Sequence, residues 1–126
     1  MHSYDYAIVR VLPRVERGEQ LNAGVILSCA AIGYLRASFE LDEAVLRCVA
    51  PGLDLEPIRA ALAGIEAVCA GGEAAGPLGQ LSPRERFHWL VAPRSTSVQV
   101  SAVHTGRCAD LDAALEDLVR KMVRRA

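Results

Sequence analysis

The chain has 126 residues, of which 52% are hydrophobic and 23% are charged, and its formal net charge is −1 at pH 7. This length and composition predict a single folded domain over residues 1–126 and argue against a disordered chain. The nearly balanced charge does not favour broad electrostatic binding to nucleic acid or to an anionic membrane.

The first third of the sequence contains three segments in which apolar and polar residues alternate. They are "YDYAIVRVL" (residues 4–12), "LNAGVILSC" (residues 21–29) and "GYLRASFEL" (residues 33–41). Alternation with many β-branched and aromatic residues is typical of strands. The links between them are too short for parallel crossovers, so we expect an antiparallel meander.

Two helices are predicted next. Asp42 is a good N-cap for a short helix over residues 43–49, and Asp54 is one for a longer helix that ends at Gly71 and Gly72. In the longer segment, apolar residues recur at helical spacing. They are Ile58, Leu62, Ile65 and Cys69.

The last third is predicted to contain two strands and a helix. Ser82 and Glu85 have the spacing of a capping box for one helical turn. Residues 86–91 and 97–103 then alternate like strands, with Phe87 and Trp89 directed into the core. Asp110 begins a final helix with apolar residues along one face.

The resulting order of elements, βββ-αα-ββ-α, predicts an α+β fold. In such a fold a mainly antiparallel sheet has its helices chiefly on one face. The opposite face is then free to carry polar side chains.

The four cysteines predict no metal or redox site. Cys29, Cys48, Cys69 and Cys108 form no Cys-x-x-Cys pair, so neither a zinc site nor another cofactor is expected. The sequence has no signal-peptide pattern and no apolar run of the ~20 residues that span a bilayer. We therefore expect reduced cysteines and a cytoplasmic protein without a membrane partner.

Strand alternation and matching of apolar faces group several polar side chains on the predicted free face. We call this group the polar wall and expect it to form one surface for an anionic ligand, with Arg94 at its rim. Its members are Arg10, Asn22, Arg86, His88 and Gln99, with Ser101 beside His88. His104 is a further candidate, although a histidine in a loop is the simpler interpretation.

Three interpretations of the polar wall compete. The first is an ordinary solvated sheet face. The second is a platform where tyrosines stack against the bases of a nucleotide or nucleic acid. The third is the site of a small metal-independent hydrolase. The hydrolase would use His88 or His104 as its base and Arg86 and Arg94 to stabilise negative charge. No recognised hydrolase motif, phosphate-binding loop or RNA-binding motif occurs in the sequence.

Two long segments carry a family resemblance. "YDYAIVRVLPRVERGEQLNAGVIL" and "RFHWLVAPRSTSVQVSAVHTG" together resemble a bacterial family catalogued as domain of unknown function 3037. Members are often encoded beside a HipA-like kinase-fold protein, so the resemblance implies a partner or regulatory role and transfers no catalytic residue. It favours a non-enzymatic interaction or ligand-binding module and implies a HipA-like kinase as the partner. The oligomeric state is left open.

Overall fold

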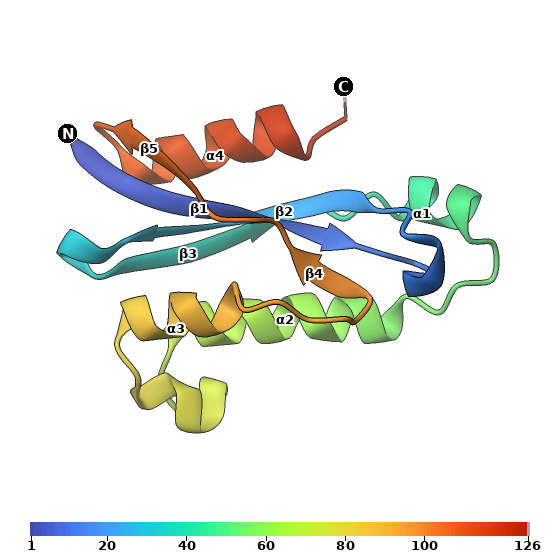
Figure 1. Cartoon of the computed structure of the whole chain (residues 1–126), viewed down its shortest axis with the longest axis horizontal. Helices are drawn as coiled ribbons and strands as arrows, with labels where there is room; N and C mark the ends of the chain where they lie inside the picture. The colour runs from blue at the N-terminus through green and yellow to red at the C-terminus, as the bar shows by residue number, and fades with distance from the viewer. Residues whose placement is uncertain (126) are drawn as a thin grey trace.

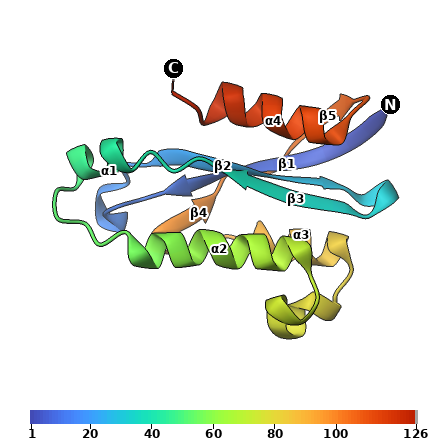
Figure 2. The same ribbon diagram turned by 180° about the vertical axis from the view of Figure 1, so that it is seen from behind.

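The computed structural model describes residues 1–125 as a five-stranded antiparallel sheet between two helical layers (Figure 1). The predicted α+β class is confirmed, and most of the helices lie on one face of the sheet, as expected. The last helix covers part of the other face, so the second face is not left free (Figure 2). Within residues 1–125, no helix is long and apolar enough to cross a membrane.

The elements follow the chain in an order close to the prediction. The strands are β1 (His2–Val11), β2 (Leu21–Cys29), β3 (Tyr34–Phe39), β4 (Val98–Val100) and β5 (His104–Cys108). The helices are α1 (Glu43–Val49), α2 (Glu56–Ala70), α3 (Pro83–Leu90) and α4 (Leu111–Met122). Three 3-10 segments are η1 (Val15–Arg17), η2 (Ala30–Ile32) and η3 (Glu73–Gln80).

The predicted meander of β1, β2 and β3 is confirmed, but it contains a bulge. Val9 pairs with Gly24 while Arg10 pairs with Asn22, so Ala23 is an extra residue in β2. An extra residue reverses which face the following side chains occupy. Asn22 and Ser28, which simple alternation placed on one face, therefore contact opposite helical layers.

Strands β4 and β5 continue one another along the same edge of β1. Val100 pairs with Val9 and His104 pairs with Tyr6, so three residues of this edge oppose two residues of β1. Ser101 fills the irregular point, because its hydroxyl accepts from the Ile8 N–H at 2.8 Å. His104 thus lies in a strand, and its interpretation as a loop residue is wrong.

Each face of the sheet has its own hydrophobic core. On one face, Val9, Ile26 and Leu35 pack against residues of α1, α2 and α3. On the other, Val25 and Leu27 pack against the apolar side of α4. Tyr34 anchors α4 to the sheet, since its hydroxyl donates to Asp112 at 2.7 Å, and burial together with this hydrogen bond raises the pKa of Tyr34.

One predicted strand is a helix. Residues 86–91 were expected to be extended, but residues 83–90 form α3, which begins at a complete capping box of Ser82 and Glu85. The sequence pattern fits both structures, because Phe87 and Leu90 are three residues apart and occupy one face of a helix. Both side chains are buried there, at 1% and 2% exposure. The helix that begins at this capping box is therefore longer than the single turn predicted.

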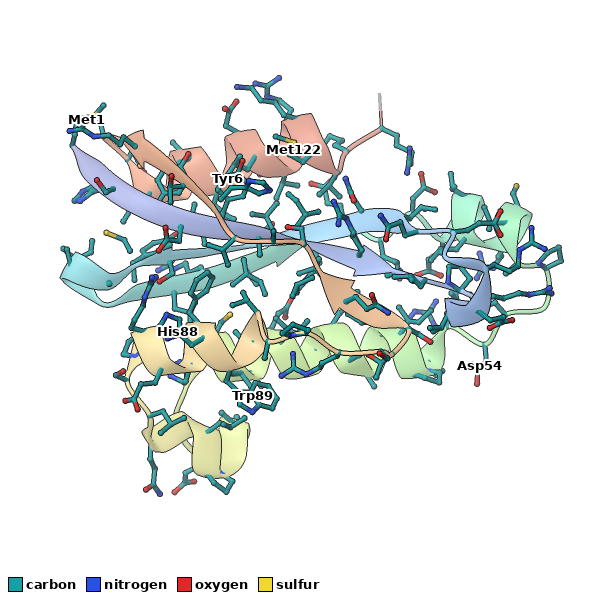
Figure 3. The ribbon with its side chains drawn as sticks, in the orientation of Figure 1. Met1, Tyr6, Asp54, His88, Trp89 and Met122 are labelled. Carbon is teal, nitrogen blue, oxygen red and sulfur yellow. The ribbon has the colours of Figure 1, made fainter. Side chains whose placement is uncertain are left out.

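The predicted burial of Trp89 is also wrong. Once residues 83–90 are helical, Trp89 no longer shares the face of Phe87, and 45% of its surface is exposed. Figure 3 shows Trp89 on the side of α3 that is turned away from the sheet.

Candidate functional site

Three members of the predicted polar wall do lie side by side. Arg10 pairs with Asn22 on one neighbouring strand and with Gln99 on the other, which places all three on the sheet face that α4 covers. Arg10 Nε donates to Asn22 Oδ1 at 3.3 Å, and Asn22 Nδ2 donates to the Met122 carbonyl at 2.9 Å. Gln99 donates to the Thr96 carbonyl at 3.0 Å. This row joins strands to one another and to the end of α4.

The remaining wall residues lie elsewhere. Arg86 and His88 belong to α3, beyond the opposite face of the sheet, so they do not form one surface with Arg10. The predicted common wall is therefore wrong as a surface. The reason is the helical form of residues 86–90, which places these two side chains in the other layer of the protein.

Arg86 is buried, with 7% of its surface exposed. Its guanidinium donates to the carbonyls of Val68 at 2.6 Å and Cys69 at 2.7 Å, and its Nε donates to the Leu81 carbonyl at 3.2 Å. The first two carbonyls belong to the last turn of α2, where partial negative charge accumulates. These contacts give Arg86 a structural role at the end of α2.

The structure brings none of the hydrolase candidates into a catalytic arrangement. His104 packs its ring against Tyr6, with 5.5 Å between ring centroids, on the α4 side of the sheet. His88 is exposed on α3 (Figure 3), so the two histidines belong to different layers. Cys108 lies at the far end of β5 from His104, and burial raises the pKa of its thiol above the ordinary 9.0. A raised pKa leaves less thiolate at neutral pH, which is the opposite of an activated nucleophile.

A cavity of about 380 Å³ opens on the outer side of the α2–α3 layer. Its walls come from α2, η3, α3 and the segment that leads into β4. Three of the lining residues of α2 are small, Ala61, Gly64 and Ala67. Trp89 and Arg94 line the side formed by α3 and the loop after it, which we call the rim. We call this cavity the Trp89–Arg94 pocket. Its volume and mostly apolar lining with a few polar groups are typical of ligand sites.

The cation of Arg94 is held in a fixed position at the rim. Its guanidinium carbon lies 4.3 Å from the centre of the Trp89 ring, which is a cation–π contact. Nη1 donates to the Leu90 carbonyl at 2.9 Å and Nη2 donates to the Trp89 carbonyl at 2.7 Å, so Arg94 also closes the C-terminal turn of α3. A guanidinium has five N–H donors, and these two bonds leave the others available.

Arg94 has no carboxylate partner in the described part of the chain. Most other arginines do have one, such as Arg59 with Glu43 and Arg124 with Glu40, but none of the ion pairs formed within residues 1–125 includes Arg94. The rim of the pocket therefore carries an uncompensated positive charge beside an apolar wall. That combination suits a ligand with an apolar body and an anionic group.

Gly64 leaves open space in the α2 wall of the pocket. It lies inside α2, where glycine is about 1 kcal/mol less favourable than alanine. A Cβ built at this position meets no atom within 4 Å. Packing within the protein therefore does not require glycine here, whereas a larger side chain would occupy the pocket.

Sequence reasoning found Arg94 but missed the pocket. Ala61, Gly64 and Trp89 are predicted as parts of a helix or of the core, and the residues of η3 are assigned to no element. The usable signal was a glycine in the interior of a predicted helix that has no turn or kink to explain it. Among residues 1–125, the structure contains no group of three His, Cys, Asp or Glu side chains placed to hold a metal ion.

Comparison with known protein families gives a match over nearly the whole chain. A family model described as "Protein of unknown function (DUF3037)" matches residues 6–123, nearly the whole chain. No curated protein and no solved structure gives a significant match.

Proposed function

The chain belongs to the DUF3037 family of proteins of unknown function, and we propose that it is a non-enzymatic binding module whose site is the Trp89–Arg94 pocket. The ligand has an apolar body that lies against the small side chains of α2, and an anionic group that accepts hydrogen bonds from Arg94. The observation that carries the proposal is the uncompensated Arg94 guanidinium stacked on a Trp89 ring that is 45% exposed.

The anionic ligand expected from the sequence is thus assigned to Arg94 and not to the polar wall. Of the residues proposed there, Arg94 combines a free charge with a neighbouring cavity. Arg86 is buried and donates from Nε and Nη1 to three backbone carbonyls, and Arg10 donates to Asn22.

Binding of simple amphipathic probes tests this proposal. Octanoate, octanol and octylamine share one apolar chain and differ in charge. Trp89 is the only tryptophan in the sequence, so its fluorescence reports on the pocket without a label. We expect octanoate to bind about tenfold more tightly than octanol, because a charge-assisted hydrogen bond adds to the apolar contact. Octylamine should bind most weakly, because its cation faces Arg94.

Variants then locate the site. Arg94→Gln should reduce the affinity for octanoate to that for octanol, and Gly64→Leu should weaken both by filling the pocket. Arg107→Gln is the matched control, since Arg107 is an exposed arginine on β5 that does not line the pocket. Equal affinity of the wild-type protein for the three probes, or no binding of any of them, would contradict the proposal whatever the variants do.

A protein partner is the second candidate, favoured by the types of residue at the rim. Tryptophan and arginine contribute most binding energy in many protein interfaces, where they surround or fill apolar pockets. The resemblance described above implies a HipA-like kinase-fold protein as partner, and we propose that such a protein docks over the Trp89–Arg94 pocket.

Calorimetric titration with a HipA-like kinase-fold protein tests the second candidate. Trp89→Ala should weaken binding at least about tenfold, the size expected for a hot-spot residue. Ile32→Ala is the control, because Ile32 is 58% exposed but belongs to η2, outside the pocket lining. Unchanged affinity in Trp89→Ala would place any such interface elsewhere.

A further inference from the structure

Strand β3 is an edge of the sheet whose outer side has no partner strand. The sheet order is β3-β2-β1-β4, and β3 pairs with β2 without interruption from Tyr34 to Phe39. Alternate residues of an edge strand direct their backbone N–H and C=O groups away from the sheet. In the part of the chain that the structure describes, no hydrogen bond joins these outer groups to another segment. Figure 2 shows β3 at the front, between α4 and α2.

The opposite edge of the sheet is different. There residues 101–103 oppose only two residues of β1, and this irregularity divides the edge into β4 and β5. The Ser101 hydroxyl accepts a hydrogen bond from the Ile8 N–H at that point. Bulges and short segments are common devices that prevent a sheet edge from accepting another strand. Strand β3 has six residues in regular pairing, with no bulge or proline, and its one charged side chain, Arg36, is paired with Asp112 of α4. One edge is thus protected and the other is available.

A groove runs beside the outer edge of β3. It has a volume of about 550 Å³ and lies between β3 and the last two turns of α2. Leu35 and Ala37 form its strand side, and Cys69 and Ala70 form part of its helix side. An edge strand beside a helix is the geometry in which several peptide-binding domains add an extended peptide to a sheet.

The free charge in this groove is negative. Glu66 is exposed on the helix side and takes part in no ion pair formed by residues 1–125. Arg36 also borders the groove, but its guanidinium pairs with Asp112 of α4 on the other face of the sheet. A cation in the added segment would therefore complement Glu66.

We propose that an extended segment of a partner protein adds to β3 as a sixth strand. Its backbone pairs with the outer N–H and C=O groups of β3, small apolar side chains face Leu35 and Cys69, and a lysine or arginine pairs with Glu66. A second copy of this chain could also pair through its own β3 and extend the sheet. Its Leu35 and Ala37 would then face the groove, and no cation would lie near Glu66. The inference concerns a surface separate from the Trp89–Arg94 pocket.

Selection from a phage-displayed library of random peptides of about twelve residues supplies the probe. We expect the selected peptides to share alternating β-branched or small residues with one basic residue at a fixed place. Glu66→Lys should weaken the best peptide about tenfold, because an attraction becomes a repulsion. Glu16→Lys makes the same change of charge in η1, away from the groove, and should leave the affinity unchanged.

Backbone methylation of the peptide distinguishes strand addition from other modes of binding. In an added strand only alternate residues hydrogen-bond to the edge. N-methyl groups on one alternate set should reduce affinity at least about tenfold, since several hydrogen bonds are lost, and on the other set they should have little effect. This comparison leaves the protein unaltered, so it does not depend on whether a variant folds.

Amide hydrogen exchange then locates the added strand. Alternate amides of β3 should exchange rapidly in the free protein and become protected when the best peptide binds. Two results would overturn the proposal. One is a set of peptides whose affinity is insensitive to Glu66→Lys and to the position of the methyl groups. The other is a concentration-dependent dimer in which the same amides are already protected without peptide. Gly64→Leu should not change peptide binding, because Gly64 lines the Trp89–Arg94 pocket and not this groove. The two proposals can therefore fail independently.

Discussion

Arg86 closes the end of helix α2 by donating a hydrogen bond to the carbonyl oxygen of Val68 at 2.6 Å. The same nitrogen donates to Cys69, and the chain turns immediately afterwards at Gly71, which has φ 75°. A Cβ at Gly71 would lie 2.9 Å from Nη1 of Arg86. The arginine side chain therefore occupies the inside of the turn that leads from α2 into η3, and so it supports one wall of the Trp89–Arg94 pocket.

Arg86→Ala should lower the free energy of unfolding by about 2–4 kcal/mol. The variant leaves the Val68 and Cys69 carbonyls without their buried donor, and unsatisfied buried groups of this kind cost about 1–3 kcal/mol each. Urea denaturation measures the change. Arg107→Ala, at an exposed position of β5, should differ from wild type by less than about 0.5 kcal/mol. If both variants were equally stable, the structural role of Arg86 would be refuted.

Trp89→Ala should cost little stability for so large a change. Almost half of the ring is exposed, so its removal should lower the free energy of unfolding by about 1 kcal/mol. Phe87→Ala is the internal comparison, because Phe87 is 1% exposed and a buried aromatic usually costs about 3–5 kcal/mol. Urea denaturation of both variants measures the contrast. Equal losses would mean that Trp89 belongs to the core after all.

Gly64→Ala should stabilise the protein by about 0.5–1 kcal/mol. Alanine has the higher helix propensity, and its methyl group meets no atom within 4 Å. Thermal and urea denaturation measure the gain. Gly72→Ala provides the contrasting case, since Gly72 has φ 75° and a side chain there would be strained. A destabilised Gly64→Ala protein would show that the glycine serves the fold and not the pocket.

The cysteines should differ strongly in their reactivity toward a maleimide reagent at neutral pH. Cys48 is exposed on α1, whereas Cys69 is buried and burial raises the pKa of its thiol to about 12. Because the thiolate is the reactive form, Cys69 should remain unmodified until the protein unfolds. Mass spectrometry of peptides after timed labelling gives the order of modification. Equally rapid labelling of Cys69 and Cys48 would contradict the packing between α2 and β3.

The capping box of α3 should make stability depend on pH through Glu85. The N–H of Ser82 donates to the Glu85 carboxylate at 3.2 Å, and this bond holds the pKa of Glu85 below its ordinary 4.5. Because the folded-state pKa is the lower one, the stabilisation is complete above the unfolded-state pKa. It is lost as the pH falls through the folded-state value.

Glu85→Gln should therefore reduce the loss of stability that accompanies acidification from about pH 5 to about pH 3. Circular dichroism during urea titration at several pH values measures this slope. Glu16→Gln is the control, since Glu16 lies in η1 and has no capping role. A slope unchanged by Glu85→Gln would mean that the capping box contributes nothing measurable.

Some features of the fold were predictable because they depend on neighbouring residues. Asp42 and Asp110 were predicted as N-caps, and each carboxylate accepts from the N–H three residues later, at 3.1 Å. The meander of β1, β2 and β3 followed from alternation and short links in the same way. The α+β class then followed from the order of these elements, which is why one wrongly assigned strand did not change it.

The wrong assignment of residues 86–91 also has a local cause. A segment of six residues is too short for a period of two to be distinguished from a period near four, and Phe87 and Leu90 satisfy the helix as well as Phe87 and Trp89 satisfy the strand. The capping box at Ser82 and Glu85 is present in the sequence, and it begins a helix that continues to Leu90. The helix places Arg86, His88 and Trp89 in the layer of α2, whereas a strand would have placed them in the sheet.

The sequence by itself determined the fold class, the N-caps Asp42 and Asp110 and most of the elements, because these arise from hydrogen bonds and side-chain periods within a few residues. The prediction of Asp54 as the N-cap of α2 is wrong, since Leu55 occupies that position and its side chain makes no capping hydrogen bond. Only the tertiary structure decided where the candidate sites lie. The bulge at Ala23 placed Asn22 and Ser28 on opposite faces, and the last turn of α2 engaged the donors of Arg86. The packing of η3 and α3 against α2 created the pocket beside Arg94. Each of these depends on contacts between residues far apart in the chain, which no local pattern encodes.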